Sequence, residues 1–403
     1  MASRTDRAPL HLLRLALTAI VALATWVALP RTASAYPWML RHGATQCGAC
    51  HADPSGSGLL TNAGRARGDK LMRFQWGTPA TDTSKGKLFW GVDTPDWLLF
   101  GGSIRNGYLL THINGAPKQP DPRFLQMQAD LRTQITVDRF RAHGSLGFLH
   151  EGGAPTWVTT QRENNLVSRE HWLGVDLGAD REWLVRAGRL NLPFGIRGNE
   201  HTLWVRKTFR TDVNEGQQHG VAVSYAAGEH RAELMAVVGN LQLRPDLYRE
   251  QGLVGYYEHA FTKRAAAGVS ALFLRTSVDP TLGKEATRHG YGAFLRFAPV
   301  KPLVLLVEGD AVLQKAIGDA LGSGFVGFFQ ADLEPVQGVH VMLTGEALKR
   351  PSTSGTAIGG WLSLVWFLAP HADLRLDGIF QSVPAGDTRS KATTLLAQMH
   401  VYL

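Results

Sequence analysis

The residues best suited to chemistry lie near the start of the chain, at Cys47-Gly48-Ala49-Cys50-His51. Two cysteines two residues apart, followed at once by histidine, form the C-x-x-C-H pattern of covalent haem attachment. In this pattern the two thiols bond to the porphyrin edge and the histidine becomes the proximal ligand of the iron. The sequence therefore predicts one haem c, held by Cys47, Cys50 and His51.

Two other uses of a C-x-x-C pair are not favoured by the sequence. A redox disulfide of this kind expects a βαβ context, and a zinc site needs a further Cys or His pair at close spacing. Cys47 and Cys50 are the only cysteines, and neither pattern surrounds them. Haem attachment is the interpretation that remains.

A distal ligand of the iron is less clearly marked. Met72 follows His51 by 21 residues on a helix expected over 63–73, and a thioether there would raise the reduction potential. His42 and Met39 compete for the same role, and Met72 could instead pack as an apolar side chain on the haem face. We expect His51 and Met72 to be the two metal ligands.

Residues 1–35 have the pattern of a cleaved signal peptide. A polar stretch with Arg4, Arg7 and Arg14 precedes an apolar run over 15–29, and an A-x-A-type site ends at Ala35. The apolar run is short for a transmembrane helix, although a retained anchor is the alternative. Export places haem attachment outside the cytoplasm.

Residues 36–96 form the predicted haem segment. The residues around the motif are turn formers and the segment has few apolar side chains, so we expect it to need the rest of the chain as a wall around the haem. The formal charge of +8 includes +3 from the signal, and no basic cluster with interleaved aromatics is present. We therefore expect no nucleic-acid partner.

From residue 97 to 403 the hydrophobic pattern has period two, which is typical of transmembrane β-strands with lipid on one side and water on the other. Leu131 and Ile135 share one predicted face, whereas Asp130, Arg132 and Gln134 share the other. We predict sixteen strands, at 97–110, 125–137, 140–150, 168–177, 183–190, 217–226, 230–238, 252–259, 265–275, 289–297, 303–313, 325–333, 339–348, 358–367, 372–381 and 393–403.

The connections between these strands alternate strictly between long and short. This asymmetry is typical of bacterial outer-membrane barrels, whose long loops lie outside and whose tight turns lie in the periplasm. The fold class is therefore all-β: a 16-stranded antiparallel, porin-like transmembrane barrel in the outer membrane. Its lumen is wide enough for an aqueous channel or a plug. We expect residues 36–96 to lie wholly or partly inside it, with His340 and Met342 among the lumen-facing residues of the barrel.

The longest loop, 191–216, has three interpretations. It could fold inward as a constriction, where its basic residues would favour anions. It could hold a metal cation through its carboxylates and imidazole. It could also be an ordinary solvated loop with mixed charges. The candidate metal ligands are Glu200, His201, Asp212 and Glu215.

Together these features resemble the fused monohaem cytochrome–porin proteins of the outer membrane, best known as iron oxidases. The resemblance covers the mature chain as architecture and is most specific at Cys47, Cys50 and His51. The run from Leu59 to Arg65 is similar to a leucine, asparagine and glycine run downstream of the haem motif in related proteins, and 189–210 is similar to phosphate-selective-type porins.

The resemblance implies electron passage between extracellular Fe(II), or another redox substrate, and a periplasmic cytochrome c or other carrier. As an enzyme the chain would be an iron:cytochrome c oxidoreductase; no catalytic triad or acid–base carboxylate pair stands out in the sequence. Two alternatives stay open. One is an anion-selective porin with a structural or gating haem, and the other is outward electron transfer to extracellular acceptors.

Overall fold

The structure is a computed structural model that describes residues 37–43, 45–56, 58–76, 93–148, 166–198, 200, 203–213, 216–241, 249–279 and 281–403. All of them belong to one compact unit, Thr32–Leu403. The predicted signal peptide, residues 77–92 of the predicted haem segment, His201 and Glu215 lie outside the described residues.

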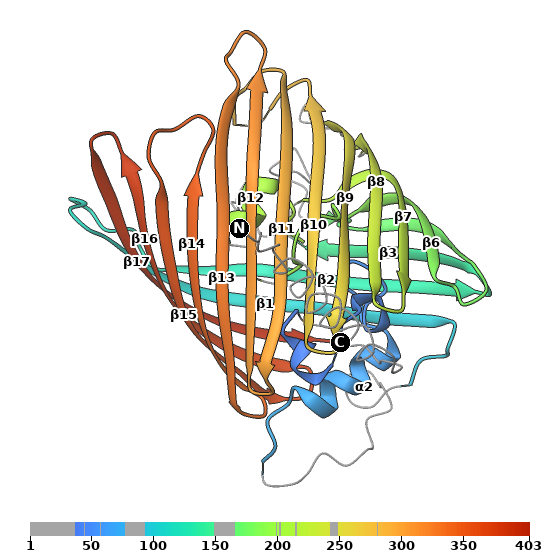
Figure 1. The fold of residues 1–403 in the computed structure, drawn as a ribbon. Helices are drawn as coiled ribbons and strands as arrows, with labels where there is room; N and C mark the ends of the chain where they lie inside the picture. Colours follow the sequence, from blue (N-terminus) through green and yellow to red (C-terminus); the bar gives the residue numbers. More distant parts are fainter. Residues whose placement is uncertain are drawn as a thin grey trace, which may run out of the picture. The chain divides into compact units, whose positions relative to one another are not determined.

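Within the described residues, seventeen strands form one antiparallel sheet that closes on itself (Figure 1). Closure follows because β1 (Leu98–Ile113) pairs with both β2 (Arg123–Val137) and β17 (Thr388–Tyr402). The short β4 (Leu166–Val167) and β5 (His171–Leu177) both pair with β3 (Phe140–Phe148), so they share one position in the barrel. The described strands therefore fill sixteen positions, as predicted.

The strand positions predicted from the sequence are confirmed, and the bounds differ from the predicted ones by no more than five residues at either end. For example, β11 covers Ala286–Val300 where 289–297 is predicted. The other strands are β6 (Trp183–Leu190), β7 (Gln218–Ala227), β8 (His230–Gly239), β9 (Glu250–Thr262), β10 (Ala265–Thr276), β12 (Leu303–Ala316), β13 (Gly322–Val336), β14 (Val339–Lys349), β15 (Ala357–Ala369) and β16 (Ala372–Ala385).

The two faces of the strands differ as the period-two pattern predicts. On β2, Leu131 and Ile135 are exposed on the outside, whereas Asp130 and Arg132 are buried in the lumen. A closed barrel with an apolar outer surface needs a lipid bilayer around it, and this arrangement is that of outer-membrane barrels. None of the described helices is long and apolar enough to cross a membrane.

Short turns join the strands at one end of the barrel and long loops join them at the other (Figure 1). Gly338, between β13 and β14, has a φ of +83°, which glycine adopts without strain. Helix α2 (Asn62–Leu71) lies at the end with the short turns (Figure 1). Since short turns face the periplasm in such barrels, this is the periplasmic end.

Two segments of the chain fill the lumen of the barrel and form the core of the molecule. We call residues 37–76 the plug; it contains the 3₁₀ turns η1 (Pro37–His42) and η2 (Cys47–Ala49) as well as α2. Ion pairs join it to the barrel wall, from Arg41 to Asp332 and from Asp53 to Arg186. The second segment is the loop between β6 and β7, which contains α3 (Trp204–Phe209). The expected plug is therefore present as a packing arrangement.

Candidate functional site

The cysteine motif folds into a tight turn. The backbone N–H groups of Cys50 and His51 both donate to the carbonyl oxygen of Cys47, each over 3.0 Å. The chain then doubles back, because His51 pairs with Leu60 in an isolated β-bridge. Backbone hydrogen bonds within the plug thus define the local fold of the motif.

Helix α2 packs directly on this turn. Thr61 caps the helix by accepting a hydrogen bond from the Gly64 N–H over 3.0 Å, and its own N–H donates to the carbonyl oxygen of Cys50 over 2.9 Å. A Cβ on Gly64 would lie 2.3 Å from that same oxygen. The run from Leu59 to Arg65 therefore couples the motif to the helix, and only glycine at 64 permits the contact.

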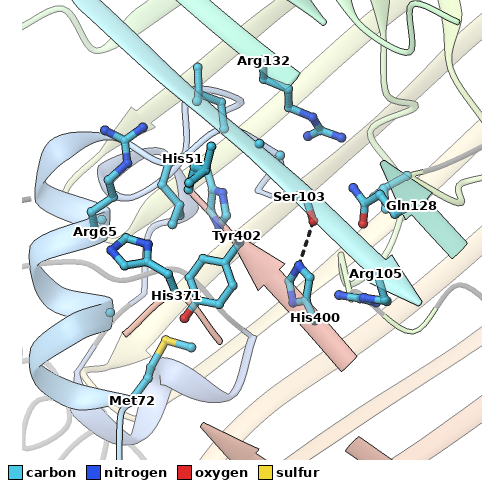
Figure 2. Close-up of a pocket in the computed structure, with 18 of the residues that line it drawn as sticks. His51, Arg65, Met72, Ser103, Arg105, Gln128, Arg132, His371, His400 and Tyr402 are labelled. Atoms are coloured by element: carbon cyan, nitrogen blue, oxygen red, sulfur yellow. Dashed lines mark hydrogen bonds between the residues drawn. The ribbon is translucent and has the colours of Figure 1, made fainter. Parts of the chain in front are cut away.

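A pocket lies between the plug, the barrel wall and the inward loop, and holds about 1070 Å³ of space not filled by atoms, part of it continuous with solvent. Figure 2 shows His51, Met72, His371 and Tyr402 converging on it, with Arg132 on the opposite side. The plug contributes His51 and Met72, and β1, β2 and β17 contribute the wall.

The two predicted axial ligands, His51 and Met72, thus line the same pocket. The other two candidates for the distal position do not. His42 lies 3.8 Å from a carboxylate oxygen of Glu334, and Met39 is fully buried in the apolar core. Neither residue lines the pocket. The geometry favours Met72 over His42 and Met39 as the distal ligand.

The two thiols lie outside the lining of the pocket. Cys47 Sγ accepts a hydrogen bond from the guanidinium of Arg231 on β8. Cys50 is fully buried, and this burial raises the pKa of its thiol to about 12. Both thiols belong to the same turn as His51, so they lie on the plug side of the site.

The donor set of this site fits a haem iron. An imidazole and a thioether line one pocket from two different parts of the plug, and this pair is one of the standard axial sets of c-type cytochromes. Gly64 and Gly68 also line the pocket, and because they have no side chains they leave this face of α2 open toward it. The residues present are therefore compatible with the predicted cofactor.

Several lining residues were not anticipated from the sequence. His400 lies on β17 and its side chain faces the lumen. Its Nδ1 lies 2.9 Å from the carboxylate of Asp373, and its Nε2 lies 2.7 Å from Ser103 Oγ. His371 lies in the turn between β15 and β16 with a φ of +65°, a conformation that no sequence pattern indicates. The lining also includes Arg65, Arg105, Arg132 and Arg197.

The loop 191–216 folds into the lumen, so its interpretation as a solvated loop is wrong. Phe194, Val205 and Phe209 are fully buried. Glu308 on β12 holds the loop, because it accepts hydrogen bonds from the Ile196 N–H over 3.0 Å and from Arg206 over 2.7 Å. The inward folding that a constriction loop requires is the arrangement observed.

The carboxylates proposed as metal ligands in this loop have other partners. Glu200 pairs with Arg375 over 2.9 Å, and Asp212 lies 3.8 Å from Lys207. The guanidinium of Arg375 helps to hold the pKa of Glu200 below its usual range against the opposing effect of burial. Among the described residues, no cluster of three or more His, Cys, Asp or Glu side chains is arranged to hold a metal ion.

His340 and Met342 face the lumen as predicted, but they pack against the plug and do not line the pocket. The His340 ring lies 4.4 Å from the Trp38 ring between centroids, and its Nδ1 lies 3.0 Å from Asp332. Met342 is buried in the same apolar cluster as Trp38. Both residues hold the plug in place against the barrel wall.

No protein-family model and no curated protein matches this sequence. The fold is similar to solved porins at low sequence identity. The anion-selective porin from Comamonas acidovorans aligns with a TM-score of 0.56 at 12% identity over 76% of this chain and 99% of that chain. The outer membrane protein OmpT of Vibrio cholerae gives 0.56 at 10% identity, over 76% and 99%. The outer membrane channel DcaP of Acinetobacter baumannii gives 0.52 at 13% identity, over 76% and 97%. The porin-like barrel is thereby established as the fold.

Proposed function

We propose that this chain is an outer-membrane electron-transfer protein that passes electrons from extracellular ferrous iron to a periplasmic cytochrome c through one covalently attached haem. One observation carries the proposal. His51 and Met72, singled out in the sequence as an axial pair, line the same pocket inside a lipid-facing barrel. The resemblance of the motif and barrel to fused cytochrome–porins supports the same function.

The residues of the plug would hold the cofactor. Cys47 and Cys50 would form the two thioether bonds, His51 would be the proximal ligand and Met72 the distal one. A haem bound in this way supplies one-electron redox chemistry at a potential raised by the thioether ligand. Leu59 and Leu60 give the pocket apolar surface, which excludes water from the porphyrin face.

The barrel and its inner segments would insulate the site. The plug is joined to the wall by buried ion pairs at two points, Arg41 near its start and Asp53 near its middle. The inward loop, held by Glu308, lies across the lumen on the other side of the pocket. The plug and the inward loop thereby occupy the lumen, and electron transfer needs no open channel through it.

The stoichiometry is one electron for each iron. One extracellular ferrous ion is oxidised to ferric, and one oxidised periplasmic cytochrome is reduced, with no atom or proton transferred. The exit would be at the periplasmic end, where Gln337 in the turn between β13 and β14 donates to the carbonyl oxygen of Lys70 over 2.9 Å. This contact places the helix that carries Met72 beside the periplasmic rim.

The test uses purified full-length protein from a strain that matures c-type cytochromes. Haem content is measured by the pyridine haemochrome assay, and anaerobic stopped-flow absorbance follows haem reduction by ferrous iron. We expect one haem per chain and rapid reduction. His51→Ala removes both the proximal ligand and the rapid phase, whereas His42→Ala, a change of histidine in the same plug outside the pocket, preserves them.

Protein without covalent haem would refute the proposal. A haem reduced by dithionite but not by ferrous iron would redirect it to outward electron transfer. Proteoliposomes with an enclosed cytochrome c then establish the sidedness of transfer.

An anion-selective porin is the second candidate, and the arginines that line the pocket favour it. An open, anion-selective conductance in planar bilayers would support this function. The plug and inward loop speak against a wide channel, because together they fill the lumen with buried side chains such as Trp38 and Phe194.

A further inference from the structure

The C-terminal end of the plug leaves the lumen. Met72 is 4% exposed and lines the pocket, whereas Trp76 is 66% exposed. The indole N–H of Trp76 donates over 2.9 Å to the carbonyl oxygen of Leu368, which lies near the periplasmic end of β15. Over residues 72–76 the chain therefore passes from the pocket to the edge of the barrel.

The chain crosses the periplasmic rim at the turn between β13 and β14. Gln337 in this turn donates to the carbonyl oxygen of Arg73 over 3.1 Å, and its own side-chain oxygen accepts from Gln75 Nε2 over 3.1 Å. A Cβ on Gly338 would clash with the backbone of Phe74, so the two chain segments are in direct contact. Hydrogen bonds and close packing thus fix the path of the plug over the rim.

The plug contacts both faces of β15. On the lumen side, the Trp38 ring packs on Phe367 with 5.9 Å between centroids. On the opposite face of the strand, the Trp366 ring lies 6.1 Å from the Phe74 ring and 5.6 Å from the Trp76 ring, again between centroids. These separations are those of favourable aromatic pairs. The barrel rim is thus held by the plug from the inside and from the outside.

The outer face that carries Trp366 is continuous with the lipid-facing surface of the barrel. Leu362 and Leu364 alternate with Trp366 on this face of β15, and both are exposed. Leu374 of β16 pairs with Trp366 in the sheet and is exposed on the same surface. Since Trp366 is nearer the periplasmic end of β15 than the two leucines, it lies at the edge of the apolar band, where a bilayer meets water.

An indole at this level has the chemistry of a membrane-interface residue, because its ring is apolar and its N–H is polar. The N–H of Trp76 is already bonded to Leu368, so the exposed part of this side chain is mainly its apolar ring. Aromatic residues on barrel strands are expected at the interface in any outer-membrane barrel. Here the barrel contributes Trp366, whereas Phe74 and Trp76 come from the segment that also fills the lumen.

We propose that Phe74, Trp76 and Trp366 form a membrane-interface anchor of the plug, and that its partner is the phospholipid surface of the periplasmic leaflet. The bilayer then covers the exposed ring of Trp76. Because Met72 and the anchor lie on one short segment, lipid as well as the barrel holds this end of the plug at the pocket. The anchor does not depend on the haem, since none of its three rings lines the pocket.

The experiment uses full-length protein, labelled with fluorotryptophan, in nanodiscs of phosphatidylethanolamine and phosphatidylglycerol. The fluorine resonance of Trp76 is identified by its absence from the spectrum of Trp76→Phe. Broadening of this resonance is measured with a lipid that carries a nitroxide just below its headgroup and, separately, with a water-soluble gadolinium chelate. The resonance of Trp361, identified in the same way, is the control, because Trp361 is buried in the lumen and donates to Glu346.

We expect the nitroxide lipid to broaden the Trp76 resonance strongly, the gadolinium chelate to leave it nearly unchanged, and the Trp361 resonance to respond to neither. Broadening of the Trp76 resonance by the chelate alone overturns the anchor, because Trp76 then faces the periplasm and is open to a protein partner there. Broadening by neither probe also overturns it, because the ring is then covered by protein.

Hydrogen–deuterium exchange in the same nanodiscs tests whether the anchor holds the plug. We expect Trp76→Ala to lower the amide protection of α2, whereas Trp97→Ala leaves it at the wild-type value. Trp97 is the matched control because it is an exposed tryptophan directly before β1, outside the plug. Heat-modifiable gel mobility verifies that each barrel is folded. Wild-type protection of α2 in Trp76→Ala would show that the plug is held without the anchor and would overturn the anchoring role.

Discussion

Gly64 and the carbonyl oxygen of Cys50 approach so closely that a Cβ on residue 64 would lie 2.3 Å from the oxygen. Gly64→Ala therefore forces α2 away from the Cys47–His51 turn. Alanine gains about 1 kcal/mol of helix propensity but meets an overpacking cost of about 1–3 kcal/mol. We expect the amide protection of α2 in hydrogen–deuterium exchange to fall by up to about tenfold, in line with a net loss near 1 kcal/mol.

Gly68→Ala is the control for this prediction. It adds the same methyl group one turn later on α2, where the nearest neighbour of the new Cβ is Met72 Sδ at 3.7 Å. That distance is an ordinary van der Waals contact, so the helix gains propensity without a clash. Equal loss of protection in the two variants would show that the Cys50 contact is unimportant.

Met72→Ala tests the distal ligand. Truncation of this buried side chain costs about 2–5 kcal/mol, and in addition removes the thioether from the pocket. We expect loss of the charge-transfer band of methionine-ligated ferric haem and a lower reduction potential. The measurement is visible and near-infrared absorbance together with a redox titration of the holoprotein.

Met39→Ala gives the matched comparison. Met39 is a fully buried methionine of the same plug and does not line the pocket. Its truncation has a similar stability cost and leaves the haem spectrum unchanged. A spectrum altered by Met39→Ala, or by His42→Ala, and unaltered by Met72→Ala would exclude Met72 as the ligand.

The barrel could be predicted from the sequence because each strand separates its faces residue by residue. Apolar Leu131 between polar Asp130 and Arg132 fixes both the strand and its orientation toward lipid. The ends of the strands were harder to predict, because the contrast between the apolar and the polar face fades outside the band that faces lipid. At the start of β11, for example, Thr287 and Arg288 follow Ala286, and Arg288 is held by Glu250 of β9, a pairing that no local pattern shows.

The residues that the plug contributes to the site could be predicted, because the motif that marks them is local in the sequence. The residues that the barrel wall contributes could not be predicted, since their positions depend on how the barrel closes. Ser103 pairs with Tyr402 across the β1–β17 seam, and this closure brings His400 to within 2.7 Å of Ser103 Oγ. His400 could have been noticed, because it alternates with the outward-facing Met399. The inward loop also carried a usable signal, in the apolar Phe194, Val205 and Phe209 that a solvated loop would not contain.

Burial of His42 makes plug docking sensitive to pH. Burial lowers the pKa of His42 from 6.5 to about 4, against the opposing effect of Glu334. Between these pH values the undocked histidine binds a proton and the docked one does not, so docking is weakened as the pH falls from 6.5 to 4. The full effect corresponds to about 3 kcal/mol.

Hydrogen–deuterium exchange of residues 37–43, corrected for the intrinsic pH dependence of exchange, measures this effect. Wild-type protection declines through the window from pH 6.5 to 4. In His42→Gln, which has no titratable ring, the decline is absent or much reduced. The same decline in both proteins would assign the pH dependence to other groups of the plug.

Glu308 anchors the inward loop, and its removal opens the lumen. It is 1% exposed and accepts hydrogen bonds from both the Ile196 N–H and Arg206. Glu308→Ala leaves the buried guanidinium of Arg206 without its carboxylate, which destabilises the loop by about 3–5 kcal/mol. We expect a larger and noisier single-channel conductance in planar bilayers.

Glu285→Ala is the control, because Glu285 forms an exposed pair with Arg275, and such pairs contribute about 0–1 kcal/mol. Conductance that rises equally in the two variants, or in neither, would show that the loop is held by contacts other than Glu308.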